Sequence, residues 1–218
     1  MKSFFTMAIC KKKQQVPETK TRDTILAAAV EEFAQNGFAG ARTENIAKAA
    51  NVNKAMLHYY FQDKETLYDA VLDTLYAWLL ETETLTQEVA ITPMNSVQFV
   101  HLFLKIVVHK HANPHNEAFR RILAWELAAG QNNFKRVAQK YIVPRILQLK
   151  QVLEVGIANG ELQCKNPILT LYSMVSQVVF YYMHRYTYED TPIHDELYSN
   201  VTPNYFLSFL LENFIACY

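Results

Sequence analysis

From residue 19 onwards, apolar positions repeat with the period of an α-helix, and polar residues that favour helix ends separate the repeats. A first helix is expected to begin at Thr19 or Thr21, either of which can cap it, and to end at Gly37. Its inward-facing stripe consists of Leu26, Ala29, Val30 and Phe33. Residues 1–18, which precede it, are expected to form a disordered tail.

Two short helices are expected next, over 44–50 and 54–61, and only residues 51–53 separate them. Three residues leave room for a tight turn and for nothing longer. Side chains of Ser, Thr, Asn and Asp accept hydrogen bonds from the free N–H groups at a helix start, so they mark where helices begin. The expected N-caps of these two helices and of the following one are Thr43, Asn53 and Asp63.

The rest of the chain predicts six longer helices. Their expected ranges are 64–86 or beyond, 95–111, 114–130, 133–159 with a kink at Pro144, 167–187, and a last helix after Pro203. The helix over 167–187 is apolar on nearly every side, which requires burial. Since no strand-like alternation persists, we expect an all-α fold of about nine helices. A three-helix N-terminal domain over 19–64 would precede a larger helical domain over 65–218.

Composition and charge refine this picture. Half of the 218 residues are hydrophobic, and five Gly with seven Pro favour long helices over many-turned sheets. The formal net charge is zero, but residues 1–64 carry ten Lys or Arg against six Asp or Glu, whereas residues 65–218 carry eleven against fifteen. Net charges of +4 and −4 indicate a nucleic-acid-binding head on a neutral-to-acidic body. The three cysteines form no CxxC pair, so we expect a reducing, cytoplasmic location.

The helix expected over 54–61 has two distinct faces. Leu57 and Phe61 lie four residues apart and can pack inward, while the polar and aromatic residues between them face outward. Together with the helix over 44–50, this is the pattern of a helix-turn-helix, whose second helix enters the major groove of DNA. Lys and His can bond to base edges there, and a small residue permits close approach. The expected DNA contacts are Arg42, Thr43, Asn53, Lys54, Ala55, His58, Tyr59, Tyr60 and Lys64.

Residues 21–70 resemble the DNA-binding domain of the tetracycline-repressor (TetR) family of bacterial transcription regulators. The family patterns Phe-x-x-x-Gly-Phe, Thr-x-x-x-Ile-Ala and Val-Ser-x-x-x-Leu-Tyr-x-Tyr-Phe-x-x-Lys-Glu-x-Leu correspond to residues 33–38, 43–47 (with one residue fewer) and 52–67. Asn51 replaces the usual turn glycine, which is tolerable because Asn adopts the left-handed conformation most readily after Gly. His58 replaces the usual first Tyr of the recognition helix, so the DNA contacts there are expected to differ.

The resemblance implies a ligand-responsive transcriptional regulator, most simply a repressor that binds a pseudo-palindromic operator as a dimer and leaves it when a small effector binds. It also implies dimerisation through the last two helices, near 167–187 and 203–217, and a ligand cavity among the central helices. The aromatic body suits an apolar or aromatic effector. The candidate pocket residues are Trp78, Phe99, Phe103, Trp125, Tyr172, Met174 and Tyr181.

Other classes of function stay open at this point. A DNA-binding activator would use the same head, and so would an architectural DNA-binding protein, although the latter is expected to be more basic and needs no large aromatic body. An enzyme is the least expected class, because the sequence shows no nucleophile–base pairing, phosphate loop or metal-ligand spacing. No metal or cofactor is expected. The apolar stretch at residues 4–10 is too short to span a membrane and precedes its lysines, so neither a membrane partner nor secretion is expected.

Overall fold

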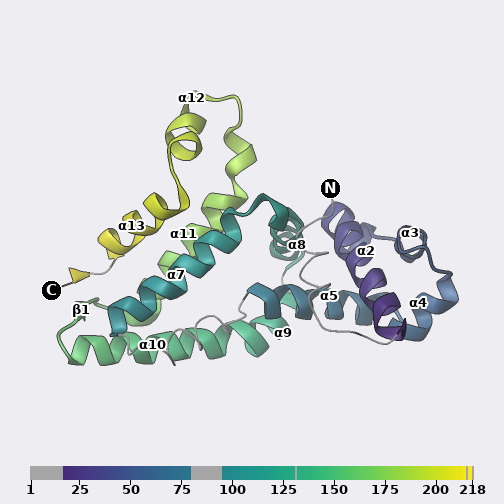
Figure 1. Ribbon diagram of the computed structural model, residues 1–218, viewed down its shortest axis with the longest axis horizontal. Helices are drawn as coiled ribbons and strands as arrows, with labels where there is room; N and C mark the ends of the chain where they lie inside the picture. Colours follow the sequence, from purple (N-terminus) through teal and green to yellow (C-terminus); the bar gives the residue numbers. More distant parts are fainter. Residues whose placement is uncertain (1–16, 80–94, 131, 215, 218) are drawn as a thin grey trace. The chain divides into compact units, whose positions relative to one another are not determined.

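The computed structural model describes residues 17–79, 95–130, 132–214 and 216–217 (Figure 1). Most residues in these ranges lie in helices, and the strands among them are two dipeptides, so the predicted all-α class is confirmed. Internal contacts divide the chain into two compact units. Unit 1 falls within Met1–Trp78 and Pro114–Ala138, and unit 2 within Leu79–Asn113 and Gln139–Tyr218.

Unit 1 contains the three helices of the expected head and several further elements. They are α2 (Pro17–Gly40), α3 (Thr43–Ala49), α4 (Lys54–Phe61), α5 (Lys64–Leu79, whose last residue belongs to unit 2), the 3-10 turn η1 (Pro114–Asn116), α8 (Glu117–Ala128) and α9 (Asn132–Val137). The helix predicted over 54–61 has the predicted bounds, and α3 lies one residue earlier than predicted. The expected extension of α5 to Thr86 falls outside the described residues, as do residues 1–16 of the expected tail.

Gly37 interrupts α2 at the place where the first helix was expected to end. Its backbone has φ 64° and ψ 176°, after which the chain makes one more turn to Gly40. Residues with a side chain rarely adopt this conformation. A Cβ atom at position 37 would also lie 2.8 Å from Cδ2 of Trp125 on α8. Glycine is therefore required here both for the break in the helix and for the close approach of α8.

The core of unit 1 forms between α2, α5 and α8. The predicted inward stripe of α2 is buried at all four positions, which confirms that prediction. The ring of Phe33 meets the ring of Tyr68 on α5 edge-on, with 4.7 Å between centroids. Phe38 lies 5.0 Å from the same ring. From α8, Trp125 Nε1 donates a hydrogen bond to the carbonyl of Ala34 on α2, at 3.3 Å.

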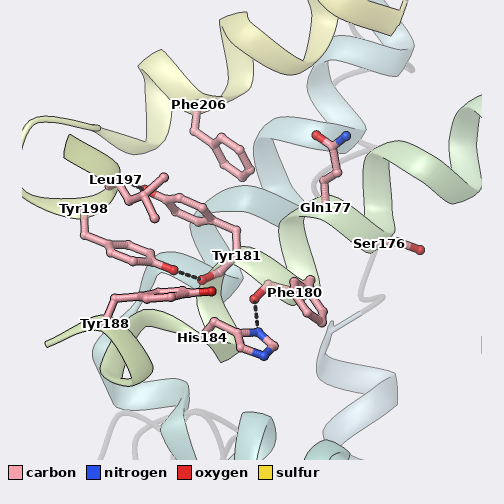
Figure 2. A pocket seen from close by; sticks show the side chains of 9 residues that line it. All are labelled: Ser176, Gln177, Phe180, Tyr181, His184, Tyr188, Leu197, Tyr198 and Phe206. Carbon is pink, nitrogen blue, oxygen red and sulfur yellow. Dashed lines mark hydrogen bonds between the residues drawn. The ribbon is translucent and has the colours of Figure 1, made fainter. Parts of the chain in front are cut away.

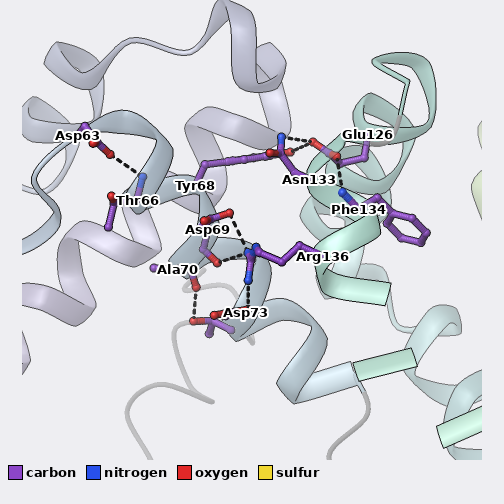
Figure 3. Close-up of polar contacts among 11 residues, drawn as sticks. Asp63, Thr66, Tyr68, Asp69, Ala70, Asp73, Glu126, Asn133, Phe134 and Arg136 are labelled. Carbon is purple, nitrogen blue, oxygen red and sulfur yellow. Dashed lines mark hydrogen bonds and ion pairs between the residues drawn. The ribbon is translucent and has the colours of Figure 1, made fainter. Parts of the chain in front are cut away.

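A buried carboxylate connects α5 to α8 and α9 (Figure 3). Glu126 accepts hydrogen bonds from the Tyr68 hydroxyl at 2.7 Å, from Asn133 Nδ2 at 3.3 Å and from the backbone N–H of Phe134 at 3.1 Å. Burial, followed by the hydrogen bond to Glu126, raises the pKa of Tyr68, so its hydroxyl stays protonated and can donate. A buried carboxylate needs such partners, because an unpaired charge in the interior is costly.

Arg136 adds a second connection between α9 and α5. Its guanidinium forms ion pairs with Asp69 at 2.8 Å and with Asp73 at 3.0 Å (Figure 3). Segment 114–138 is therefore packed with the N-terminal helices, although the sequence predicted a boundary between 19–64 and 65–218. That division into a DNA-binding domain and an effector-binding and dimerisation domain stays a prediction.

Unit 2 is built from long helices around one apolar core. Its elements are α7 (Ser96–Ala112), the π-helical segment η2 (Ala138–Ile142, whose first residue belongs to unit 1), α10 (Val143–Ala158), β1 (Leu162–Gln163), α11 (Pro167–Met183), the 3-10 turn η3 (Arg185–Tyr188), α12 (Pro192–His194), the π-helical segment η4 (Asp195–Ser199), α13 (Pro203–Phe214) and β2 (Ala216–Cys217). β1 pairs with β2 antiparallel, with Leu162 opposite Cys217. The core draws buried residues from α7, α10, α11 and α13, among them Leu104, Leu153, Met174 and Leu210.

Two helix boundaries in unit 2 differ from expectation. The single kinked helix predicted over 133–159 is interrupted by the π-helical segment η2, which ends two residues before Pro144. Proline lacks the N–H group that would continue the regular ladder, so the change in winding falls beside it. The helix predicted over 167–187 ends at Met183, and a 3-10 turn follows it.

Candidate nucleic-acid interface

The turn between α3 and α4 has the conformation that the sequence predicted. Asn51 has φ 54°, the left-handed conformation that the family usually obtains with glycine, so the interpretation of this departure is confirmed. Asn53 caps α4, because its Oδ1 accepts a hydrogen bond from the backbone N–H of Met56 at 2.7 Å. The predicted cap at Asn53 is confirmed, and it sets the first residue of α4.

α4 buries one face and exposes the other. Leu57 and Phe61 are buried, as is Ile46 of α3. The outward residues are Lys54, Ala55, His58 and Tyr59, all exposed, with Tyr60 partly buried at the boundary. The predicted division of this helix into an inner and an outer face is thus confirmed. Tyr59 on the outer face is 72% exposed.

The start of α3 is organised differently from the prediction. Arg42, and not Thr43, occupies the N-cap position, and its side chain forms no capping hydrogen bond. Glu32 of α2 provides the acceptor instead, since its Oε1 accepts hydrogen bonds from the backbone N–H of Arg42 at 2.9 Å and from Asn45 Nδ2 at 3.1 Å. Sequence reasoning missed Glu32, because a carboxylate ten residues away on another helix belongs to no local capping pattern.

An ion pair spans the outer surface between α3 and α4. Lys54 Nζ lies 2.5 Å from Glu44 Oε1, and both side chains are more than half exposed. The hydrogen bond and the charge of Lys54 hold the pKa of the Glu44 carboxyl below its usual range. Glu44 is the second residue near this surface that the sequence pattern did not reveal.

The start of α5 lies beside the end of α4. Gln62 has φ 57°, and its carbonyl lies 2.6 Å from His58 Nδ1. Asp63 caps α5 as predicted, with its Oδ1 accepting from the backbone N–H of Thr66 at 2.7 Å, and this bond lowers the pKa of Asp63. Lys64 Nζ lies 4.8 Å from the centre of the Phe38 ring, a cation–π distance. His58 and Lys64 thus both have contacts within the head that support their positions.

The seven predicted effector-pocket residues are divided between the two units. Trp78 and Trp125 belong to unit 1, and the others to unit 2. Phe103 and Met174 are buried in the core of unit 2, and Phe99 packs against that core. These three side chains contribute to the packed interior, and their role toward an effector stays a prediction.

Unit 2 has an open pocket of about 490 Å³, built at the chain reversal between α11 and α13 (Figure 2). Its lining is Ser176, Gln177, Phe180, Tyr181, His184, Tyr188, Leu197, Tyr198 and Phe206. Of the seven predicted residues, Tyr181 lines this pocket and Tyr172 is 63% exposed on α11. The sequence did not place these lining residues together, because they come from several elements that only the folded chain brings to one pocket.

Two reciprocal tyrosine hydrogen bonds attach η4 to α11 in this pocket. The Tyr181 hydroxyl donates to the carbonyl of Leu197. The Tyr198 hydroxyl donates to the carbonyl of Tyr181 at 2.9 Å, as Figure 2 shows. Burial raises the pKa of Tyr181 to about 12, so this donor keeps its proton at neutral pH. The aromatic walls can accommodate an apolar or aromatic molecule.

Among the described residues, no helix is long and apolar enough to cross a membrane. The sequence profile of the bacterial regulatory proteins of the tetR family matches residues 25–71, from α2 into α5. The chain is 30% identical to the HTH-type transcriptional repressor NicS of Pseudomonas putida over 165 residues, which cover 75% of this chain and 76% of NicS. The chain belongs to the TetR family. As a member of it, this chain is a DNA-binding transcriptional regulator and not an enzyme.

Two further comparisons concern the N-terminal part of the sequence and the fold. The HTH-type transcriptional regulator RutR of Escherichia coli K12 is 39% identical over 87 residues, which cover 39% of this chain and 40% of RutR. The crystal structure of HlyIIR, a hemolysin II transcriptional regulator, superimposes with a TM-score of 0.64 at 23% identity, over 90% of this chain and 98% of HlyIIR. At that identity the second likeness concerns the fold alone.

Proposed function

We propose that two copies of this TetR-family regulator bind a pseudo-palindromic operator, each with α4 in the major groove, and that a small effector releases them. The observation that carries this proposal is the exposed outer face of α4, where Lys54, His58 and Tyr59 project from a helix anchored by Leu57 and Phe61. Lys and His supply hydrogen bonds to base edges, and neighbouring cations and hydroxyls supply contacts to phosphates. The phosphate contacts are assigned to Arg42, Thr43, Tyr60 and Lys64.

Dimerisation is proposed because a single head presents one short recognition helix. Helix-turn-helix proteins gain specificity by placing two such helices about one DNA turn apart, roughly 34 Å. In the single chain, α11 and α13 carry large apolar side chains that are exposed: Ile168, Leu169, Tyr172 and Phe180 on α11, and Tyr205 and Phe209 on α13. Exposed apolar surface of this extent on two neighbouring helices supports an interface with a second copy.

We assign effector sensing to unit 2 and expect an apolar or aromatic molecule. The aromatic pocket at the end of α11 supports this class of ligand. The effector acts by binding more tightly to the form of the dimer that does not fit the operator, because only a difference in affinity between two states shifts their populations. α5 is the proposed lever, since it begins at Lys64, beside the proposed DNA surface.

The placement of α4 is tested by Lys54→Ala with Tyr60→Ala in one chain. A specific base contact is worth about 1–3 kcal/mol, so we expect operator affinity to fall at least tenfold, while sedimentation still shows a dimer. Lys135→Ala on α9 removes a lysine away from the proposed surface and is the matched control. Operator affinity equal to that of the control would refute the placement.

The proposed dimer is tested with Leu169→Glu on α11, where the leucine is 59% exposed. A charge in an apolar interface should convert the dimer to a monomer in sedimentation and reduce operator affinity at the same time. Leu147→Glu on α10 is the matched control, because that leucine is 51% exposed but lies on a different helix. The proposed interface would be contradicted if Leu169→Glu and Leu147→Glu were both monomers, or if both were dimers. Scrambling one operator half-site should likewise abolish tight binding.

A further inference from the structure

The basic residue at the start of the recognition helix is already paired within the head. Lys54 is the first residue of α4, and its Nζ lies 2.5 Å from Oε1 of Glu44 in the first turn of α3. The lysine side chain is 54% exposed and the glutamate side chain 61%. An approaching duplex can therefore reach both groups, and it meets a neutral pair in place of a free cation.

Glu44 differs from the two other carboxylates near this surface. Glu32 accepts hydrogen bonds from Arg42 and Asn45, and Asp63 accepts one from the backbone of Thr66, so both stabilise the start of a helix. Glu44 also lies in the first turn of α3, where its Oε2 accepts from the Thr43 hydroxyl at 3.5 Å. Unlike the other two, it also contacts a side chain that the proposed function assigns to base edges. Its carboxylate competes with DNA for the same ammonium group.

When Lys54 leaves Glu44 to bind DNA, the change in free energy differs between a phosphate of non-specific DNA and a base of the operator. A phosphate offers Lys54 an anionic oxygen like the one that it already has, and the exchange leaves Glu44 unpaired next to the negative backbone. A guanine offers O6 and N7 acceptors in the major groove, without adding a charge beside Glu44. Both exchanges break the pair with Glu44, but the phosphate also brings a further negative charge to the place that Lys54 occupies. Non-specific DNA thus gains less from Lys54 than the correct base does.

We propose that Glu44 is a specificity-determining residue, which withholds Lys54 from phosphates so that Lys54 leaves the pair only at the operator. This inference rests on the proposed placement of α4. The proposal explains why a carboxylate lies on the proposed DNA-binding surface. The carboxylate lowers affinity for non-specific DNA more than affinity for the operator.

The size of the effect follows from counterion release. Non-specific affinity falls with salt with a slope of about −0.9 for each phosphate that the protein neutralises. Glu44→Gln keeps the shape of the side chain but frees the lysine, so each head should gain one phosphate contact on non-specific DNA. The slope should steepen by about 0.9 per head, so lowering the salt from about 200 to about 50 mM should raise non-specific affinity by about threefold more per head than it does for the wild type. Operator affinity should change less, so the ratio of the two affinities should fall.

The experiment measures binding of the full-length protein by fluorescence anisotropy over a series of salt concentrations. One probe is a duplex selected from a random pool by the wild-type protein, and the other is the same duplex with its sequence scrambled. Glu31→Gln is the matched control, because it removes one exposed carboxylate from the part of α2 that lines a surface pocket with α8. Thermal unfolding checks that each variant is folded.

We expect Glu44→Gln to steepen the salt slope on the scrambled duplex only, and Lys54→Ala to remove this change when the two substitutions are combined. Equal gains on both duplexes, a gain no larger than that of Glu31→Gln, or a gain that persists without Lys54 would each overturn the role of Glu44. These outcomes leave the proposed function intact. If Lys54→Ala alone binds the selected duplex as tightly as the wild type, the placement of α4 and the role of Glu44 are both refuted.

Discussion

Replacement of Gly37 by alanine tests how closely the DNA-binding head depends on one backbone position. Gly37 breaks α2 with φ 64° and ψ 176°, and its carbonyl accepts the backbone N–H of Ala41 at 3.1 Å just before α3. A Cβ atom there would lie 2.8 Å from Cδ2 of Trp125, closer than real Cβ contacts come, and 3.0 Å from Cε3 of the same ring. Gly37→Ala therefore destabilises the folded state in two ways, through an unfavourable backbone conformation and through a steric clash with Trp125.

The two contributions have separate magnitudes. A backbone held in this glycine-only region costs about 1–3 kcal/mol for a residue with a side chain. Forcing an additional carbon into a packed site costs about 1–3 kcal/mol more, because neighbouring groups must shift. We expect Gly37→Ala to lower the free energy of unfolding by roughly 2–6 kcal/mol, which is a large part of the stability of an ordinary domain. Operator affinity should fall as well, since α3 begins from this break.

Other glycines of unit 1 supply the controls. Gly130 has φ 84°, and a Cβ atom there would have no neighbour within 4 Å, so Gly130→Ala carries the backbone cost alone, about 1–2 kcal/mol. Gly40 has no positive φ, and its nearest contact would be 3.5 Å, so Gly40→Ala should stay within about 1 kcal/mol of the wild type. Urea unfolding followed by far-UV circular dichroism, at one protein concentration, compares the three.

A double-mutant cycle isolates the clash. Trp125→Ala removes the atoms that a Cβ at position 37 would meet, so Gly37→Ala should cost about 1–3 kcal/mol less in that background. Our interpretation is refuted if Gly37→Ala costs no more than Gly130→Ala, or if its cost is the same with and without the tryptophan.

Three further predictions concern other parts of the chain. Asn53→Ala should cost about 1 kcal/mol in urea unfolding through loss of the α4 cap, whereas Asn53→Ser, which keeps a capping oxygen, should retain the stability of the wild type. In pH-dependent thermal unfolding, the stability that Tyr181 contributes should be complete below about pH 10 and fall between about pH 10 and 12, because folding raises the pKa of Tyr181 above its unfolded value; an unchanged slope in Tyr181→Phe would contradict this. Gly156→Ala places a Cβ 2.6 Å from that of Ser96 and should cost about 1–3 kcal/mol, with partial recovery in combination with Ser96→Gly; a variant as stable as the wild type would contradict the close approach.

The features predicted correctly are those that depend on residues close together in the chain. The cap at Asn53 and the cap at Asp63 each involve an N–H group three residues away. The left-handed turn at Asn51 reflects the preference of one residue type. By contrast, the predicted cap at Thr43 was wrong, because Glu32 on another helix provides the acceptor and the helix starts one residue earlier.

The sequence by itself determined that α4 has a buried and an exposed face, because the period of the helix and its caps are local properties, and the family motif rests on the same residues. Only the tertiary structure decided which segments join the head. Glu126 and Arg136 attach segment 114–138 to α5. It also decided that Lys54 faces Glu44 and that η4 covers the end of α11. Such pairs lie far apart along the chain or on different helices, so their contact depends on the turns between helices, which no periodicity encodes.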